Sequence, residues 1–190
     1  MITGSPSEGG IDFKDHPEGK KFEGVVYCFR NLGLKPNSYG NKPKEKYMVR
    51  IESLTEFMEA ETIEGEEVVR PFSAPIFVNK SWGDPKSRTG TKFPKLQRLR
   101  EEILGRDLED AEWYSFDPNE EFQYVRVVYN VRHTPNDNGG KPFVDVEIRD
   151  RMDDQSKGTP FNPWVCEEEF VDKRSNNGSS SAPQPIGNVS

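Results

Sequence analysis

Glu121–Arg149 reads EFQYVRVVYNVRHTPNDNGGKPFVDVEIR, and it is the strongest structural signal in the chain. Up to Thr134, apolar side chains occupy every second position, which is the period of a half-buried strand. The inward row of this strand is Val125, Val127, Tyr129 and Val131. Pro135–Lys141 is rich in turn residues, and Phe143–Arg149 alternates again. The pattern predicts an antiparallel β-hairpin.

Three more strands and one helix are expected before this hairpin. Phe22–Arg30 is rich in aromatic and β-branched residues, and Lys46–Leu54 alternates. Val68–Val78 is apolar but interrupted by two prolines, which cannot donate to a ladder. Pro94–Leu104 places its leucines and isoleucine at helical spacing, and Gly105 follows where a helix would stop. The order is therefore three strands, one helix and two strands.

This order predicts a mainly β chain folded as an OB-fold-like, five-stranded Greek-key barrel with one helix between strands 3 and 4. A small sandwich with one helix would have the same order. We expect the barrel domain to span residues 20–151. Residues 1–19 are typical of a flexible arm, and residues 152–174 form an appended acidic-aromatic segment. Residues 175–190 are polar and of low complexity, which predicts a disordered tail.

The composition excludes several classes of protein. The 190 residues include 26 Lys and Arg against 33 Asp and Glu, a formal net charge of −7, and 32% are hydrophobic. No apolar run approaches the roughly 18 residues that cross a bilayer, and the N-terminus lacks the pattern of a signal peptide. Cys28 and Cys166 are too few for a disulfide framework. We therefore expect a cytoplasmic protein with no membrane partner.

The charge is segregated along the chain. Glu52–Glu67 holds seven glutamates and no basic residue, which is typical of a solvated loop. Lys80–Arg106 holds eight basic against three acidic residues, which favours either a solvated helix face or a patch that follows phosphates. Trp82 lies in this basic run, in a loop too polar for a core. We expect it either to cap the barrel or to stack on a base, as aromatic side chains do in single-strand binding.

A second candidate surface is the outward row of the strand that ends at Thr134. Its Tyr124 would stack on a base and its arginines would contact phosphate, whereas the plainer interpretation is an exposed face with cross-strand ion pairs. The nucleic-acid-binding residues predicted from both surfaces are Arg50, Lys80, Trp82, Lys86, Arg88, Lys92, Tyr124, Arg126 and Arg132.

No constellation of residues supports an enzyme. His16 and His133 are the two histidines, and neither has a Cys or His at metal-ligand spacing. A nucleophile formed by a cysteine and His133 is one enzyme hypothesis, and a metal-dependent nuclease using Asp145 is another. Asp145 alternates with inward valines, which favours ordinary solvent-facing charge. We predict no catalytic residue, no metal and no cofactor.

The appended segment contains Thr159–Asp172, in which aromatic side chains adjoin a run of glutamates. One interpretation is that it packs back over the barrel. Another is that it binds a partner protein through Phe161, Trp164 and Phe170. Such a tail can also occupy the basic groove of its own domain until DNA displaces it, in which case deleting residues 159–190 would tighten DNA binding.

Several segments of residues 71–151 carry a family resemblance. The first three are an apolar strand (Pro75–Val78), a Lys-Ser pair (Lys80–Ser81) and an amphipathic helix (Leu96–Gly105). The others are an aromatic-Ser-Phe-Asp step (Tyr114–Asp117), a Val-Arg-His-Thr strand end (Val131–Thr134) and a Gly-Lys turn into Phe-Val-Asp-Val (Gly140–Val146). With them the chain resembles bacteriophage-encoded OB-fold proteins that are similar to single-stranded-DNA-binding proteins. It departs from them at Trp82–Phe93, which looks like an insertion, and at Glu120–Phe122, where an apolar-Gly step is usual.

The resemblance implies a role in phage DNA replication or recombination, in the cytoplasm of the host cell. We therefore predict a non-enzymatic protein of phage type that binds single-stranded DNA or RNA. The alternative is a protein-interaction or structural module. Its acidic loop and residues 159–172 would bind a phage or host replication protein.

Overall fold

The computed structural model of the chain describes residues 19–36, 42–140 and 142–168. The expected arm up to residue 18, the expected tail at 175–190 and Phe170 lie outside these residues. None of the helices in the described ranges has the length and apolar character that a bilayer span requires.

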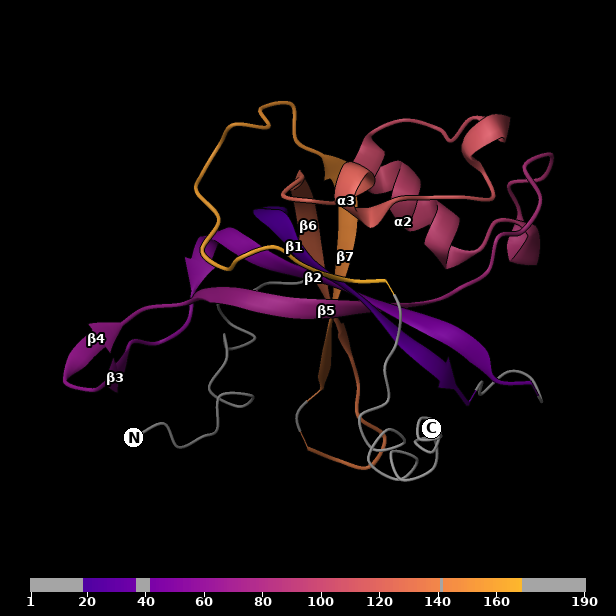
Figure 1. Ribbon diagram of the computed structural model, residues 1–190. Helices are drawn as coiled ribbons and strands as arrows, with labels where there is room; N and C mark the ends of the chain where they lie inside the picture. The colour runs from indigo at the N-terminus through magenta and orange to yellow at the C-terminus, as the bar shows by residue number, and fades with distance from the viewer. Residues whose placement is uncertain (1–18, 37–41, 141, 169–190) are drawn as a thin grey trace, which may run out of the picture.

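The chain is mainly β and is built on one curved sheet (Figure 1). Its five long strands pair antiparallel in the spatial order β5-β2-β1-β6-β7. They span Phe22–Lys35 (β1), Lys44–Phe57 (β2), Pro71–Asn79 (β5), Arg126–Thr134 (β6) and Phe143–Arg151 (β7). The five strands expected from the sequence are therefore present, with shifted ends.

The hairpin of β6 and β7 is confirmed. Tyr129 lies opposite Ile148 and Val131 lies opposite Val146 in the ladder, and all four side chains are buried. Alternation thus placed the inward row correctly, because successive side chains of a strand point to opposite faces. The inward row continues into one core with β1, β2, β5 and helix α2.

β6 begins at Arg126, five residues later than the alternation predicts. Pro118–Glu121 instead forms the short helix α3, with proline at its first position. Asp117 caps this helix by accepting a hydrogen bond from the Asn119 N–H (2.8 Å). A capped turn of helix with proline at its first position, followed by a turn at residues 122–124, therefore takes the place of the first part of the expected strand.

Helix α2 spans Lys95–Leu104 and follows β5, as expected. It buries Leu96, Leu99 and Ile103 against the sheet. Gly105 ends it with a φ of 73°, the left-handed conformation at which many helices stop. Two 3-10 turns lie before and after it, at Gly90–Lys92 and Asp110–Glu112.

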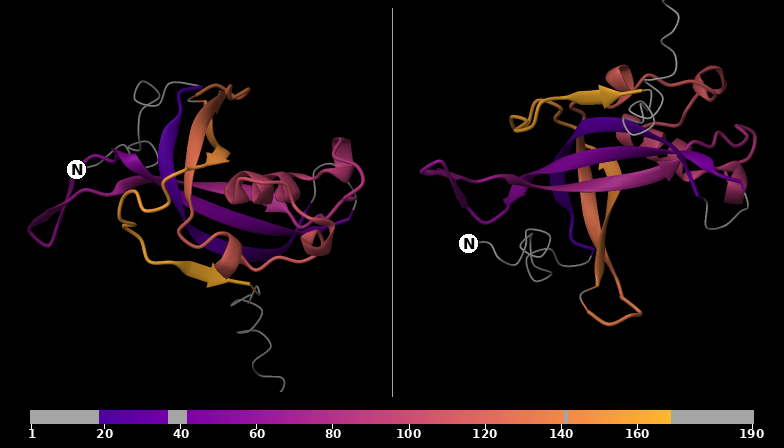
Figure 2. Two further views of the ribbon diagram at one scale, coloured as in Figure 1. Left: turned by 90° about the horizontal axis from the view of Figure 1, so that it is seen from above. Right: turned by 60° about the horizontal axis from the view of Figure 1, so that its bottom comes forward.

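Along the edge that faces away from β2, β1 pairs with two different strands. Its first residues, Phe22–Val25, pair with β6, and its middle pairs in parallel with the short strand β8 (Val165–Glu167). β1 bends between these parts, where an irregularity in the ladder lies between Val26 and Cys28. The described part of the appended segment, residues 152–168, thus returns across the sheet and is called the strap below (Figure 2).

The sheet is not closed. β5 and β7 stand at the two ends of the strand order, and no ladder joins them within the described ranges. Helix α2 packs against both strands at this seam. Pro71 and Pro75 suit β5 to an edge position, because proline has no N–H to donate. The barrel that the sequence predicts is therefore found as an open sheet of six strands, counting β8.

The glutamate-rich stretch after β2 is not the loop that its charge predicts. β3 (Glu61–Ile63) and β4 (Glu66–Val68) form a two-stranded sheet of their own. The turn residues Glu64 and Gly65 have φ values of 53° and 86°, as a two-residue hairpin turn requires. This acidic hairpin, residues 58–70, projects from the body of the molecule (Figures 1 and 2).

Candidate nucleic-acid interface

Two of the predicted contact residues, Arg50 on β2 and Lys80 directly after β5, already have partners within the protein. The Arg50 guanidinium donates to the Tyr27 hydroxyl (3.0 Å) and to the Ser73 hydroxyl (3.2 Å). Lys80 forms an ion pair with Glu45 (2.9 Å), and this carboxylate raises the pKa of Lys80. Both cations therefore already have partners that a phosphate would have to replace.

Arg88 is held by helix α2. Its Nη1 donates to the Glu101 carboxylate (2.6 Å), and its guanidinium lies over the rings of Phe93 and Trp113, 5.3 and 5.6 Å from their centroids. Glu101 raises the pKa of Arg88. The charge is neutralised and the planar group is stacked, so Arg88 fastens its loop to the helix.

Tyr124 and Arg126 hold the strap. The Arg126 guanidinium donates to the carbonyl oxygens of Tyr124, Lys157 and Gly158 at 2.8, 3.1 and 2.8 Å. The Tyr124 hydroxyl donates to the carbonyl of Asn162, and its ring meets the edge of Trp164. Trp164 also donates its Nε1–H to the Asn119 side chain (2.8 Å). The interpretation that this segment packs back onto the domain therefore describes the strap, with Phe161 half exposed on its surface.

Trp82 packs against the core. Its ring lies edge-on to Phe116, with centroids 6.5 Å apart, and its carbonyl accepts a hydrogen bond from Gln97 (3.1 Å). Of the two expectations for Trp82, this is the arrangement of a cap. The other predicted cations lie apart from it: Lys86 and Lys92 are exposed in the loop before α2, and Arg132 pairs with Glu147 (3.3 Å) on β7.

The structure gathers a different set of cations around β5. A hollow of about 560 Å³ lies between the start of β2, the second half of β5 and the start of α2. Its lining residues include four basic side chains and no acidic one: Lys44, Lys46, Lys95 and Arg98. None of the four forms an ion pair with an acidic side chain in the part of the chain that the structure describes.

Phe77 completes this basic groove, which we define as Lys44, Lys46, Phe77, Lys95 and Arg98. Phe77 points outward because its neighbours Ile76 and Val78 point into the core, and 46% of its surface is exposed. It lies opposite Met48 in the ladder with β2. Arg98 donates to the Phe93 carbonyl (3.0 Å) and lies over the Phe93 ring, but no acidic side chain neutralises its charge. An exposed aromatic ring among cations without acidic partners is the combination that single-strand binding uses.

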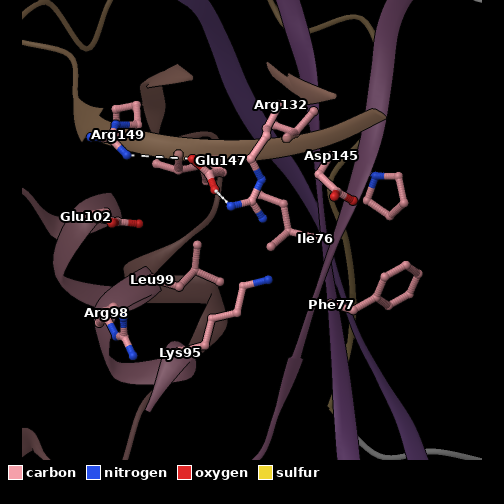
Figure 3. Close-up of a pocket in the computed structure, with 13 residues that line it drawn as sticks. Ile76, Phe77, Lys95, Arg98, Leu99, Glu102, Arg132, Asp145, Glu147 and Arg149 are labelled. Carbon is pink, nitrogen blue, oxygen red and sulfur yellow. Dashed lines mark ion pairs between the residues drawn. The ribbon is translucent and has the colours of Figure 1, made fainter. Parts of the chain in front are cut away.

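A second hollow continues from the first. The seam pocket, of about 590 Å³, lies between β5, α2 and β7 and shares Phe77, Lys95 and Arg98 with the basic groove (Figure 3). Arg132 and Arg149 enter it from β6 and β7, and both pair with Glu147 (3.3 and 3.7 Å). The pocket thus extends the groove along the open seam of the sheet.

Glu102 lies on the helix side of the seam pocket (Figure 3). Desolvation raises the pKa of this carboxyl to about 7, against the opposing effect of Arg149. No hydrogen bond or ion pair joins Glu102 to another side chain in the described ranges. It is therefore a half-buried acceptor that faces the pocket without a donor.

The sequence contains part of the signal for this groove. Lys44 and Lys46 alternate with inward Tyr47 and Val49, which places them on the outward row of β2. Their approach to α2 depends on the ladder between β2 and β5. Arg100 shows the opposite case, because this member of the basic run is fully buried and pairs with Glu121 (2.7 Å).

The enzyme hypotheses depend on Cys28 or Cys166 with His133, and on a metal site that includes Asp145. No three His, Cys, Asp or Glu side chains gather to hold a metal ion within the described residues. Burial raises the pKa of the Cys28 thiol, and burial together with Glu168 raises that of Cys166 to about 11. Both thiols are therefore protonated at neutral pH and are weak nucleophiles.

No family model, no curated protein and no solved structure matches this chain. The resemblance to phage-encoded single-stranded-DNA-binding proteins thus gains no support from these comparisons and stays a prediction.

Proposed function

We propose that this chain is a non-enzymatic protein that binds single-stranded nucleic acid along the basic groove. The observation that carries the proposal is the set of four cations without acidic partners around the exposed ring of Phe77. Lys44, Lys46, Lys95 and Arg98 would contact phosphates. Phe77 would stack on a base, a contact worth about 1–3 kcal/mol.

A single strand fits these residues better than a duplex. Stacking on Phe77 needs the open face of a base, which a duplex hides, and the cations flank that ring on both sides. Of the residues predicted from the sequence, Lys86 and Lys92 would extend the path of the strand, whereas Arg132 pairs with Glu147. We assign no base stacking to Trp82 or Tyr124, because both rings pack internally.

The strand order supports the proposal that the fold is related to the OB-fold. The order β5-β2-β1-β6-β7, with α2 between β5 and β6, is that of an OB-fold opened between its third and fifth strands. Such folds often bind oligonucleotides. A role in DNA replication or recombination, as the phage resemblance implies, is the biological setting that we propose.

The test is the affinity for fluorescently labelled oligo-dT at several salt concentrations. Four phosphate contacts predict a log–log slope of about −3, since each contributes about −0.7 on single strands. Lys46→Ala and Lys95→Ala should each make the slope less steep by about 0.7. Phe77→Ala should weaken binding about tenfold without changing the slope.

Lys157→Ala is the matched control, because this lysine pairs with Glu23 (2.6 Å) and lies outside the groove. It should leave the slope unchanged. Absent binding, or binding that does not respond to salt, would refute the proposal.

A second candidate is a protein-interaction module. The acidic hairpin and its stem expose Phe57, Ile63 and Val69 among glutamates on a projecting element. A two-stranded hairpin is marginal on its own, so a partner surface would stabilise it. This candidate predicts no salt-dependent binding of oligo-dT by the unmodified protein, and the same titration therefore separates the two functions.

A further inference from the structure

We propose that the seam pocket receives one base of the bound strand and that Glu102 selects bases with an exocyclic amino group over thymine and uracil. The inference rests on the proposed function and adds a base preference to it.

The seam pocket lies where a strand in the basic groove would continue. It shares Phe77, Lys95 and Arg98 with the groove, so a phosphate held there lies at the mouth of the pocket (Figure 3). Its volume of about 590 Å³ is in the range of pockets that take small organic ligands. One nucleotide unit can therefore turn from the groove into the pocket.

The floor of the pocket is apolar. It is formed by four side chains that are almost fully buried: Ile76, Leu99, Val146 and Ile148. The flat faces of a base pack against such surfaces, as they do in sites that hold an unstacked base. Polar recognition is left to the rim of the pocket.

On the rim, the cations of β6 and β7 already have an acidic partner. Arg132 and Arg149 share the Glu147 carboxylate. β5 contributes no charged residue to the pocket, and Asp145 adds a further carboxylate from β7. Lys95 and Arg98, on the same helix as Glu102, are the cations left to meet a phosphate.

Glu102 is left to meet the edge of the base. It extends from α2 toward Arg149 and Glu147 (Figure 3), yet it forms no hydrogen bond or ion pair with any described residue. A half-buried acceptor without a donor is costly, and a ligand that supplies N–H groups removes that cost. Desolvation, which raises the pKa of this group to about 7, agrees with that need.

The chemistry of the bases gives the preference. Cytosine, adenine and guanine carry an exocyclic amino group that donates to a carboxylate, as cytosine N4 does to Glu or Asp. Thymine and uracil have no amino group, and their ring N–H lies between two carbonyl oxygens that repel a carboxylate. A phosphate on Lys95 or Arg98 and an amino group on Glu102 together match one nucleotide of such a base.

The experiment compares oligo-dC with oligo-dU of equal length at about pH 8.5, where Glu102 is ionised. These bases have similar size and differ at the amino group and the adjacent ring nitrogen. We expect the protein to bind oligo-dC about fivefold more tightly, the lower end of discrimination by such a contact. Glu102→Ala and Glu102→Gln should both bring the ratio close to one.

Glu66→Gln is the control, since it removes a carboxylate from the exposed acidic hairpin and should keep the preference. Equal binding of the two oligomers, or a preference that survives both Glu102 variants, overturns this inference and leaves the proposed function standing. Absence of binding to either oligomer overturns both. Two variants are used because Gln keeps the size of the side chain while Ala removes all polar contact.

Discussion

Glu102 illustrates how one side chain can weigh against stability. The folded state raises the pKa of this carboxyl to about 7, above its ordinary value of 4.5, because desolvation opposes its charge. Between these two values the folded protein binds more protons than the unfolded chain. Glu102 therefore costs stability progressively as pH rises toward 7, and the full cost is present above that pH.

Glu102→Gln should accordingly raise the free energy of unfolding by about 1 kcal/mol near pH 8.5, a value reduced for partial solvent exposure. Near pH 4 the variant should gain little, because the wild-type group is mostly neutral there in both states. Urea unfolding of both proteins at the two pH values measures the difference. An equal gain at both values would show that the carboxyl charge is not the cause.

Trp82 and Phe77 differ in how far the sequence predicts whether an aromatic side chain is packed or exposed. Sequence offered two roles for Trp82, and the structure places its ring on Phe116 at the edge of the core. Phe77 lies in an apolar run and gave no functional signal, yet it is the aromatic side chain exposed in the groove. Exposure depends on which face of β5 meets the core, and a run that is apolar throughout does not reveal that face.

Among the elements, the strap is held by a buried carboxylate in addition to Tyr124 and Arg126. Glu52 lies on β2 with 1% of its surface exposed and accepts hydrogen bonds from the N–H groups of Phe161 and Asn162 (2.7 and 3.1 Å). It also accepts one from the Asn162 side chain (2.6 Å). The sequence placed Glu52 at the start of an exposed acidic run, and its donors come from more than 100 positions away.

Glu52→Gln should therefore loosen the strap, because an amide cannot accept all three hydrogen bonds as a carboxylate does. We expect a loss of about 2 kcal/mol in the free energy of unfolding. Hydrogen exchange should rise in residues 157–167 and remain unchanged in β6 and β7. Glu59→Gln, on the exposed acidic hairpin, is the control. Uniform loss of protection across the sheet would mean that the strap is not a separate unit.

At the scale of the whole molecule, the net charge of −7 describes neither of the two charged surfaces. The acidic hairpin projects before Pro71, at the N-terminal end of β5 (Figure 1), and the lining residues place the basic groove along the C-terminal half of that strand. The length of β5 separates them by about 20 Å. This exceeds the Debye length of about 8 Å at physiological salt, so the glutamates are largely screened from the groove.

A variant with Glu64, Glu66 and Glu67 all changed to Gln should thus bind oligo-dT with less than about a twofold change in affinity at about 0.15 M salt. At about 0.01 M salt, where the Debye length is about 30 Å, the same variant should bind distinctly more tightly. Titration at the two salt concentrations measures both effects. A large gain at the higher concentration would show that the hairpin contacts the groove or the strand directly.

Local rules account for the parts that were predicted well. Alternation and turn residues identify the β6–β7 hairpin, and helical spacing with Gly105 identifies α2, because each signal lies within one short segment. Those rules were wrong where two local signals compete, as at α3, and where charge conceals strand pairing, as in the acidic hairpin.

The functional surface depends on contacts between distant segments. Lys44 and Lys46 reach Lys95 and Arg98 through the ladder of β2 with β5 and the packing of α2. Arg100, five residues after Lys95 in α2, is instead buried by Glu121 and the carbonyls of the loop before α3. The local sequence pattern therefore determines which segments form strands, which segment forms the helix and where along the chain the charged residues lie. Pairing and packing in three dimensions select which charges remain without partners and face a common groove.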